Sequence, residues 1–148
     1  SPWHENLGKR QVKAPKIFFR DSGLYHALLG VAGEEDLLHH PKLGASWEGF
    51  AVEEILRRRQ AAPEEAYFWG THNKAELDLL IIKDGKREGY EVKYTAAPLV
   101  TKSMRIALED LRLDALYFVY PGKLRARVGP KIEAVGFESL FAAAPIRM

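Results

Sequence analysis

The dipeptide Asp84-Gly85 is the feature that most constrains this chain, because it is a strong signal for a two-residue turn between antiparallel strands. Strand-like segments lie on both sides of it, at residues 76–83 and 86–94. If the turn closes a regular hairpin, Lys83 faces Lys86. The register of every other pair in the hairpin then follows by counting outward from the turn.

That count brings four charged side chains together at the far end of the hairpin. Asp78 falls opposite Glu91, and Glu76 falls opposite Lys93. Because side chains alternate along a strand, all four are predicted to share one face. Two opposed carboxylates destabilise a sheet unless a cation offsets them, so the pattern predicts a hydrolytic metal site. The alternative is an exposed hairpin with solvated acids and a cross-strand ion pair between Glu76 and Lys93.

Helical and strand-like segments alternate along the rest of the chain. Apolar spacing predicts a helix over residues 47–59, capped by Ser46, and another over residues 101–113. The continuous apolar run at residues 115–120 is typical of a buried central strand. Residues 125–128 and 132–135 are expected as edge strands. The predicted fold class is therefore α/β, with a mixed β-sheet flanked by helices.

Composition limits the class of protein. With 148 residues, no cysteine and a net charge of +2, the chain is expected to form one domain that is compatible with the reducing cytoplasm. No apolar run approaches the ~20 residues of a membrane span, so no membrane partner is expected. Residues 1–15 are polar and irregular and are interpreted as an N-terminal arm or linker. Residues 16–148 are interpreted as the single domain.

Glu48 is the unusual residue of the first predicted helix. A rotation of about 100° per residue places it in the same arc as Ala51, Val52 and Ile55. A carboxylate turned toward a core is costly unless it is paired, hydrogen-bonded or bound to a metal. The alternative is an ordinary first-turn glutamate, which the helix dipole favours.

The order Glu48, Asp78, Glu91-x-Lys93 resembles the PD-(D/E)xK nuclease superfamily, although Leu77 stands where the superfamily name has proline. The chain resembles more closely a domain of unknown function that follows the ATPase module in a group of prokaryotic AAA-type ATPases. The matching stretches are Leu7-Gly8-Lys9-Arg10, residues 13–24 (KAPKIFFRDSGL), residues 44–50 (GASWEGF), Glu76-Leu77-Asp78 and Tyr90-Glu91-Val92-Lys93.

This resemblance implies a restriction-endonuclease-like core and a Mg²⁺-dependent nuclease, with DNA as the expected substrate. Asp78 and Glu91 would share Mg²⁺, or Mn²⁺ in its place, and Glu48 would be a direct or water-mediated ligand. Lys93 would assist the attacking water, and Glu76 would support Lys93. The alternative is an inactive module that couples nucleic acid or a protein to the ATPase. No G-x-x-x-x-G-K-[ST] motif is present, so ATP would act only through an upstream module absent from this chain.

Basic residues offer weak candidates for nucleic-acid contacts. One group lies near the N-terminus, where docking to an upstream domain is an equal alternative. The other opens the second predicted helix, where a solvated helix face is the simpler interpretation. The candidates are Lys9, Arg10, Lys13, Lys16, Lys102 and Arg105.

Overall fold

The computed structural model describes residues 1–5, 8, 11, 26–27, 29–30 and 32–140. The predicted domain boundary at residue 16 and the basic residues Lys9, Arg10, Lys13 and Lys16 lie outside these residues. The elements, in chain order, are α2 (Glu34–Leu38), α3 (Leu43–Arg59), the 3-10 helix η1 (Pro63–Glu65), β1 (Ala66–Gly70), β2 (Glu76–Lys83), β3 (Lys86–Val92), α4 (Lys102–Asp110), β4 (Ala115–Tyr120), β5 (Arg125–Gly129), β6 (Ile132–Gly136) and α5 (Phe137–Leu140).

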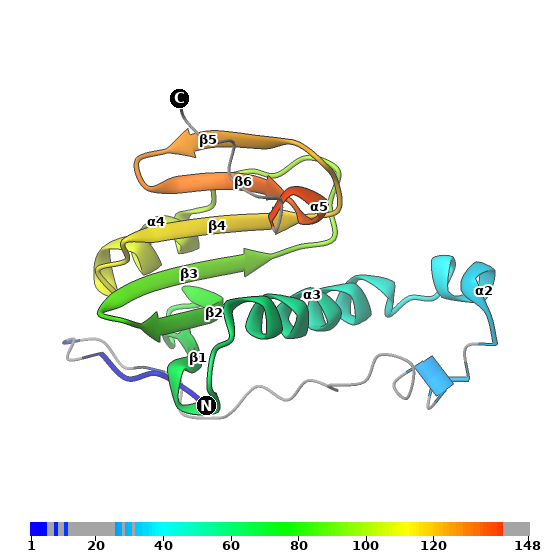
Figure 1. Ribbon diagram of the computed structural model, residues 1–148, viewed down its shortest axis with the longest axis horizontal. Coiled ribbons are helices and arrows are strands. Elements are labelled where there is room, and N and C mark those ends of the chain that lie inside the picture. The colour runs from blue at the N-terminus through cyan, green and yellow to red at the C-terminus, as the bar shows by residue number, and fades with distance from the viewer. Residues whose placement is uncertain (6–7, 9–10, 12–25, 28, 31, 141–148) are drawn as a thin grey trace.

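In the described part of the chain, the strands form one six-stranded sheet in the order β1-β2-β3-β4-β6-β5 (Figure 1). Strand β3 is parallel to β4, and β4 is parallel to β6, whereas the other neighbours are antiparallel. The predicted mixed sheet is therefore confirmed. The expectation that residues 132–135 form an edge strand was wrong. Ile132, Ala134 and Val135 are buried, and β6 lies between β4 and β5.

Helices cover both faces of the sheet. Helix α3 packs on one face and α4 on the other, where it lies behind the strands in Figure 1. Burying a side chain of leucine size contributes roughly 1.5–3 kcal/mol, so these two layers supply much of the stabilisation. The α3-side cluster includes Ala51, Val52, Ile55, Leu79, Ile81, Tyr90, Val92 and Val119. The α4-side cluster includes Leu77, Leu80, Met104, Ala107, Leu111 and Leu116.

The turn between β2 and β3 has the predicted geometry. Asp84 and Gly85 have φ angles of 50° and 75°, and a type I′ turn requires positive φ at both central residues. Pairing runs from Lys83–Lys86 to Leu79–Tyr90 in the predicted register. Strand β3 ends at Val92, two residues before the expected end.

The first residues of the chain run beside β1 (Figure 1). The N–H of Phe68 donates to the carbonyl of Ser1 at 3.0 Å, and the N–H of Trp3 donates to the carbonyl of Phe68 at 2.8 Å. The carboxylate of Glu5 forms a 2.6 Å ion pair with Arg87 on β3. Burial opposes ionisation of Glu5, but hydrogen bonds from Trp3 and Arg87 outweigh it and lower the pKa of Glu5. These contacts fasten residues 1–5 to the sheet.

Helix α3 begins earlier than the sequence predicted. It starts at Leu43 and contains 17 residues, and Lys42 occupies the N-cap position. Ser46 is therefore not the cap; it is buried within the first turns, where its hydroxyl contacts the ring of His26. No helix in residues 32–140, or elsewhere among the described residues, is long and apolar enough to cross a membrane.

Candidate functional site

Asp78 lies where β2 and β3 stop pairing. The paired residues end at Leu79 and Tyr90. Beyond them, the backbone N–H of Val92 donates to Oδ2 of Asp78 at 3.0 Å. A side-chain carboxylate thus accepts a hydrogen bond from the β3 backbone at this point. We call this end of the hairpin the open end, and the end at Asp84-Gly85 the closed end.

A β-bulge in β2 accompanies the end of regular strand pairing at Asp78. Tyr67 of β1 pairs with Leu80, but Trp69 pairs with Leu77, so β2 holds one extra residue between these pairs. Asp78 and Leu79 are the two residues that share this interval. Asp78 also lines a small cavity of about 100 Å³ together with Val52 of α3.

The bulge shows that one expectation was wrong, namely that all four charged side chains share a face. Leu77 packs in the α4-side cluster and Leu79 in the α3-side cluster, so alternation is broken between them. Glu76, next to Leu77, therefore lies on the α3 side. Glu91 lies between Tyr90 and Val92, which both pack on the α3 side, so Glu91 faces the α4 side.

Glu91 and Lys93 differ in their surroundings. Glu91 is partly exposed, but its Oε2 atom is buried. The side chain of Lys93 is exposed, while its backbone N–H donates to the carbonyl of Val119 at 3.0 Å. The expected ion pair between Glu76 and Lys93 does not occur among the ion pairs of the described residues. The backbone of Glu76 is instead bonded to the hydroxyl of Ser103.

Glu48 lies on the sheet-facing stripe of α3, as predicted. Ala51, Val52 and Ile55 follow it by three, four and seven residues, and all three are buried in the α3-side cluster. The ring of the preceding residue, Trp47, lies 5.9 Å from the ring of Tyr94. This contact places the first half of α3 near the end of β3, where Lys93 lies.

The three predicted metal ligands do not form a preassembled set. Among the described residues, no group of three or more Asp, Glu, His or Cys side chains could hold a metal ion. Magnesium often binds through only one or two carboxylates and keeps several waters. Asp78 and Glu91 lie on adjacent strands at the open end, but Asp78 lines a cavity with Val52 of α3 whereas Glu91 faces the α4 side, so a shared ion stays a prediction. The ligand role of Glu48 stays a prediction.

Of the candidate nucleic-acid contacts, only Lys102 and Arg105 are among the described residues. Lys102 and Arg105 are exposed in the first part of α4, and no ion pair within the described residues involves either of them. The arrangement is compatible both with phosphate contact and with a solvated helix face. Their role stays a prediction.

A polar network that the sequence did not reveal runs from Tyr90, the last residue of β3 paired with β2, back toward the closed end, where Arg59 and Glu88 lie near Asp84. The hydroxyl of Tyr90 donates to Glu88 at 2.6 Å and accepts from Arg59 at 2.8 Å. Arg59 also lies 3.3 Å from Glu88. Burial, followed by the hydrogen bond to Glu88, raises the pKa of Tyr90 well above its ordinary value. Glu88 and Tyr90 lie two apart on β3, but no local signal points to Arg59, which is 31 residues from Tyr90.

Comparison with known proteins gives a family without an assigned function. Residues 43–140 match the family described as Domain of unknown function (DUF4143), and residues 1–35 match Domain of unknown function (DUF8612). Uncharacterized proteins of Mycobacterium bovis and Mycobacterium tuberculosis are each 42% identical over 146 residues, which cover 99% of this chain and 33% of the relative. The chain thus spans about a third of the length of these curated relatives. No solved structure matches the chain.

Proposed function

The chain belongs to the DUF4143 family, and we propose that it is a nuclease-like domain that hydrolyses phosphodiester bonds of nucleic acid, with DNA as the first candidate. The observation that carries this proposal is the hydrogen bond from Val92 to Asp78. It holds one carboxylate at the open end, beside the strand that bears Glu91 and is followed by Lys93. Two carboxylates and a lysine at one strand end suit metal-assisted hydrolysis.

In this proposal the side chains have distinct roles. Asp78 and Glu91 would hold Mg²⁺ or Mn²⁺, with Glu48 acting from α3 through water. Bound there, Mg²⁺ would acidify a water molecule and offset the charge that develops on the phosphate. Lys93, whose side chain is exposed, would orient the attacking water or stabilise the charged phosphate.

A second candidate is a coupling module without catalytic activity. Domains of the DUF4143 family are known to accompany AAA ATPase domains, and the curated relatives are about three times as long as this chain. The lack of a three-carboxylate group among the described residues favours this candidate. In this case the domain would dock nucleic acid or a protein partner for an upstream ATPase module.

Calorimetric titration with Mg²⁺ and Mn²⁺ separates the two candidates. We expect the wild type to bind metal and Asp78→Asn to lose binding. Asp84→Asn is a matched control, because Asp84 is an exposed carboxylate at the closed end of the same hairpin. The metal-binding proteins would then be assayed for cleavage of DNA and RNA. Equal metal affinity in wild type and Asp78→Asn, or no affinity in the wild type, would contradict the proposed site.

A further inference from the structure

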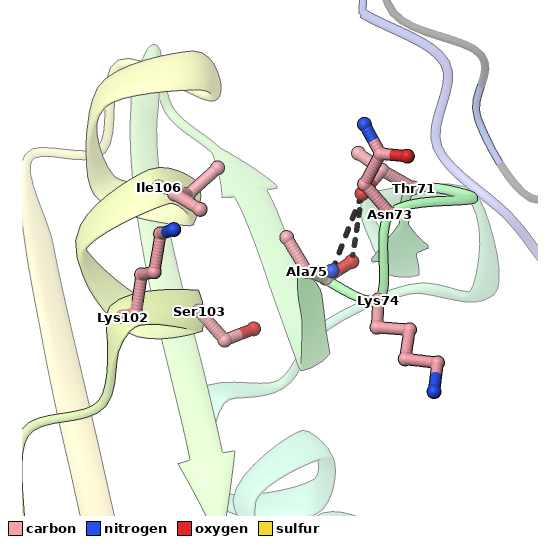
Figure 2. A pocket seen from close by; sticks show the side chains of 7 residues that line it. All are labelled: Thr71, Asn73, Lys74, Ala75, Lys102, Ser103 and Ile106. Carbon is pink, nitrogen blue, oxygen red and sulfur yellow. Dashed lines mark hydrogen bonds between the residues drawn. The ribbon is translucent and has the colours of Figure 1, made fainter.

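The two outer edges of the sheet differ in what lies beside them. At the β1 edge, the N–H of Trp3 donates to the carbonyl of Phe68 at 2.8 Å. Gln11 bridges to Thr71 just beyond β1, and the hydroxyl of Thr71 is bonded to Ala75 across the turn that follows (Figure 2). The opposite edge is β5 (Figure 1). Among the described residues, β5 pairs with β6 and with no other segment.

Pairing with β6 determines which backbone groups of β5 point outward. The N–H of Gly136 donates to the carbonyl of Leu124 at 2.7 Å. Mutual hydrogen bonds recur at every second pair of an antiparallel ladder, so Arg125 and Arg127 lie in the pairs without them. Their N–H and C=O groups therefore point away from β6. A β-bulge between Arg127 and Gly129 ends the regular ladder. We call residues 124–127 the β5 edge.

The β5 edge is basic on one face and apolar on the other. Arg125 lies opposite Val135, which packs in the α3-side cluster, so Arg125 and Arg127 lie on the α3 side of the sheet. Leu124 and Ala126 lie on the α4 side by the same alternation, and Leu124 is 75% exposed. A strand added to this edge would present its side chains to the two faces in the same alternation.

The charge around β5 is positive. Residues 123–131 contain no acidic residue and four basic residues, namely Lys123, Arg125, Arg127 and Lys131. Glu133 accepts from Nε of Arg125 at 2.6 Å, which leaves the other guanidinium donors of Arg125 for a further carboxylate. Arg127 is exposed and forms no ion pair with another described residue. The β5 edge is therefore complementary to a negatively charged partner.

The outward backbone groups and the arginines together define that partner. A second copy of the chain, paired edge to edge, would bring arginines opposite arginines, which destabilises a sheet. A nucleic acid would meet the arginines through its phosphates, but it would leave the outward C=O groups without donors in a ladder. An extended peptide satisfies both requirements, because acidic side chains two residues apart would lie opposite Arg125 and Arg127.

We infer that the β5 edge binds an extended segment of a protein partner in which acidic and apolar residues alternate. The acidic side chains lie on the α3 side beside Arg125 and Arg127, and the apolar ones lie on the α4 side beside Leu124. This docking surface goes beyond the proposed function and does not depend on it, because no residue of the open end takes part.

The test is a titration of the isotope-labelled protein with a short peptide in which glutamate alternates with valine, followed by NMR. We expect the amide signals of Arg125 and Arg127 to shift most, because their N–H groups would bond to the peptide. Arg127→Glu should weaken the peptide affinity about tenfold, because a repulsive cross-strand pair replaces an attractive one. Lys86→Glu makes the same change of charge at an exposed position of the closed end and should leave the affinity unchanged.

Two control peptides test the strand geometry on the wild-type protein, so their result does not depend on the folding of a variant. Methylation of the peptide nitrogens that face β5 should abolish binding, and so should replacement of glutamate by lysine. Equal binding of the methylated peptide would overturn the inference, since side chains alone would then make the contact. Absence of peptide-induced shifts at Arg125 and Arg127 would also overturn it. The same holds if these signals respond to protein concentration or to single-stranded DNA instead of the peptide, because the occupant would then be a second copy or a nucleic acid.

Discussion

The two ends of the β2–β3 hairpin meet the same electrostatic problem and solve it differently. At the closed end the register opposes Lys83 to Lys86. The ammonium of Lys83 turns to the C-terminus of α3, where it donates to the carbonyl of Gln60 at 2.6 Å. A helix C-terminus carries partial negative charge, so this contact offsets the repulsion. The ladder itself stays regular.

At the open end the predicted register would oppose Asp78 to Glu91. Here the ladder changes instead, because the bulge shifts β2 and the carboxylate of Asp78 accepts the N–H of Val92. The comparison teaches that the like charges at the closed turn are accommodated by neighbouring groups within a regular ladder, whereas at the open end the ladder itself is interrupted. Departures from local regularity of this kind are expected at functional sites.

Tyr90→Ala tests the polar network that reaches back to the closed end and should have the largest effect. Tyr90 is fully buried, and its hydroxyl joins Glu88 to Arg59. Truncation of a buried aromatic side chain typically costs about 3–5 kcal/mol in the free energy of unfolding. Urea denaturation followed by circular dichroism measures this cost. A loss below about 1 kcal/mol would mean that the closed end is not held by this residue.

Asp78→Ala tests the open end, with an intermediate effect. Removing the acceptor of the Val92 N–H should cost about 1–3 kcal/mol, because a partly buried donor loses its partner. Asp78→Asn keeps an acceptor oxygen and should cost less. Glu76→Ala is the control at an exposed position of the same strand and should change stability by less than about 0.5 kcal/mol. Equal stability of the alanine and asparagine variants would show that this hydrogen bond does not hold the open end.

The contrast between the closed end and the open end also explains which features could be predicted from the sequence. The turn depends on Asp84 and Gly85 alone, so the closed end and its register followed from local residue preferences. The inward position of Glu48 followed from helical periodicity, which the packing of α3 preserves. Strand β4 was predicted with its observed bounds, because a continuous apolar run is typical of a buried strand and its ends mark the ends of the strand.

The bulge could not be predicted from the residues that contain it. It arises where Trp69, buried in the α4-side cluster, pairs with Leu77 instead of Asp78, and this choice depends on packing between separate strands. The polar network at the closed end was missed for a similar reason, since Arg59 belongs to another element. Counting along one hairpin therefore gave the correct residues near the open end but the wrong common face.

Tyr90→Phe gives the smallest effect and separates the hydroxyl from the ring. Near pH 7 we expect a cost of about 0.5–1.5 kcal/mol, because two hydrogen bonds are lost while Arg59 and Glu88 still pair. Burial and the bond to Glu88 raise the pKa of Tyr90, so the folded state keeps its proton above pH 10, the ordinary value, where the unfolded chain loses it. The wild type should then lose up to about 1.4 kcal/mol of stability per pH unit from this group.

The difference between wild type and Tyr90→Phe should therefore shrink as the pH rises above 10. Urea denaturation at pH 7, 9, 10 and 10.5 follows this difference. Tyr117→Phe is a matched control, because burial also raises the pKa of Tyr117, whose ring stacks on that of Tyr90 at 5.2 Å. Tyr117 is only partly buried and its hydroxyl does not bridge Glu88 to Arg59, so its variant should show a weaker trend. A constant difference for Tyr90→Phe across this range would mean that the hydroxyl is solvated and that burial does not hold its proton.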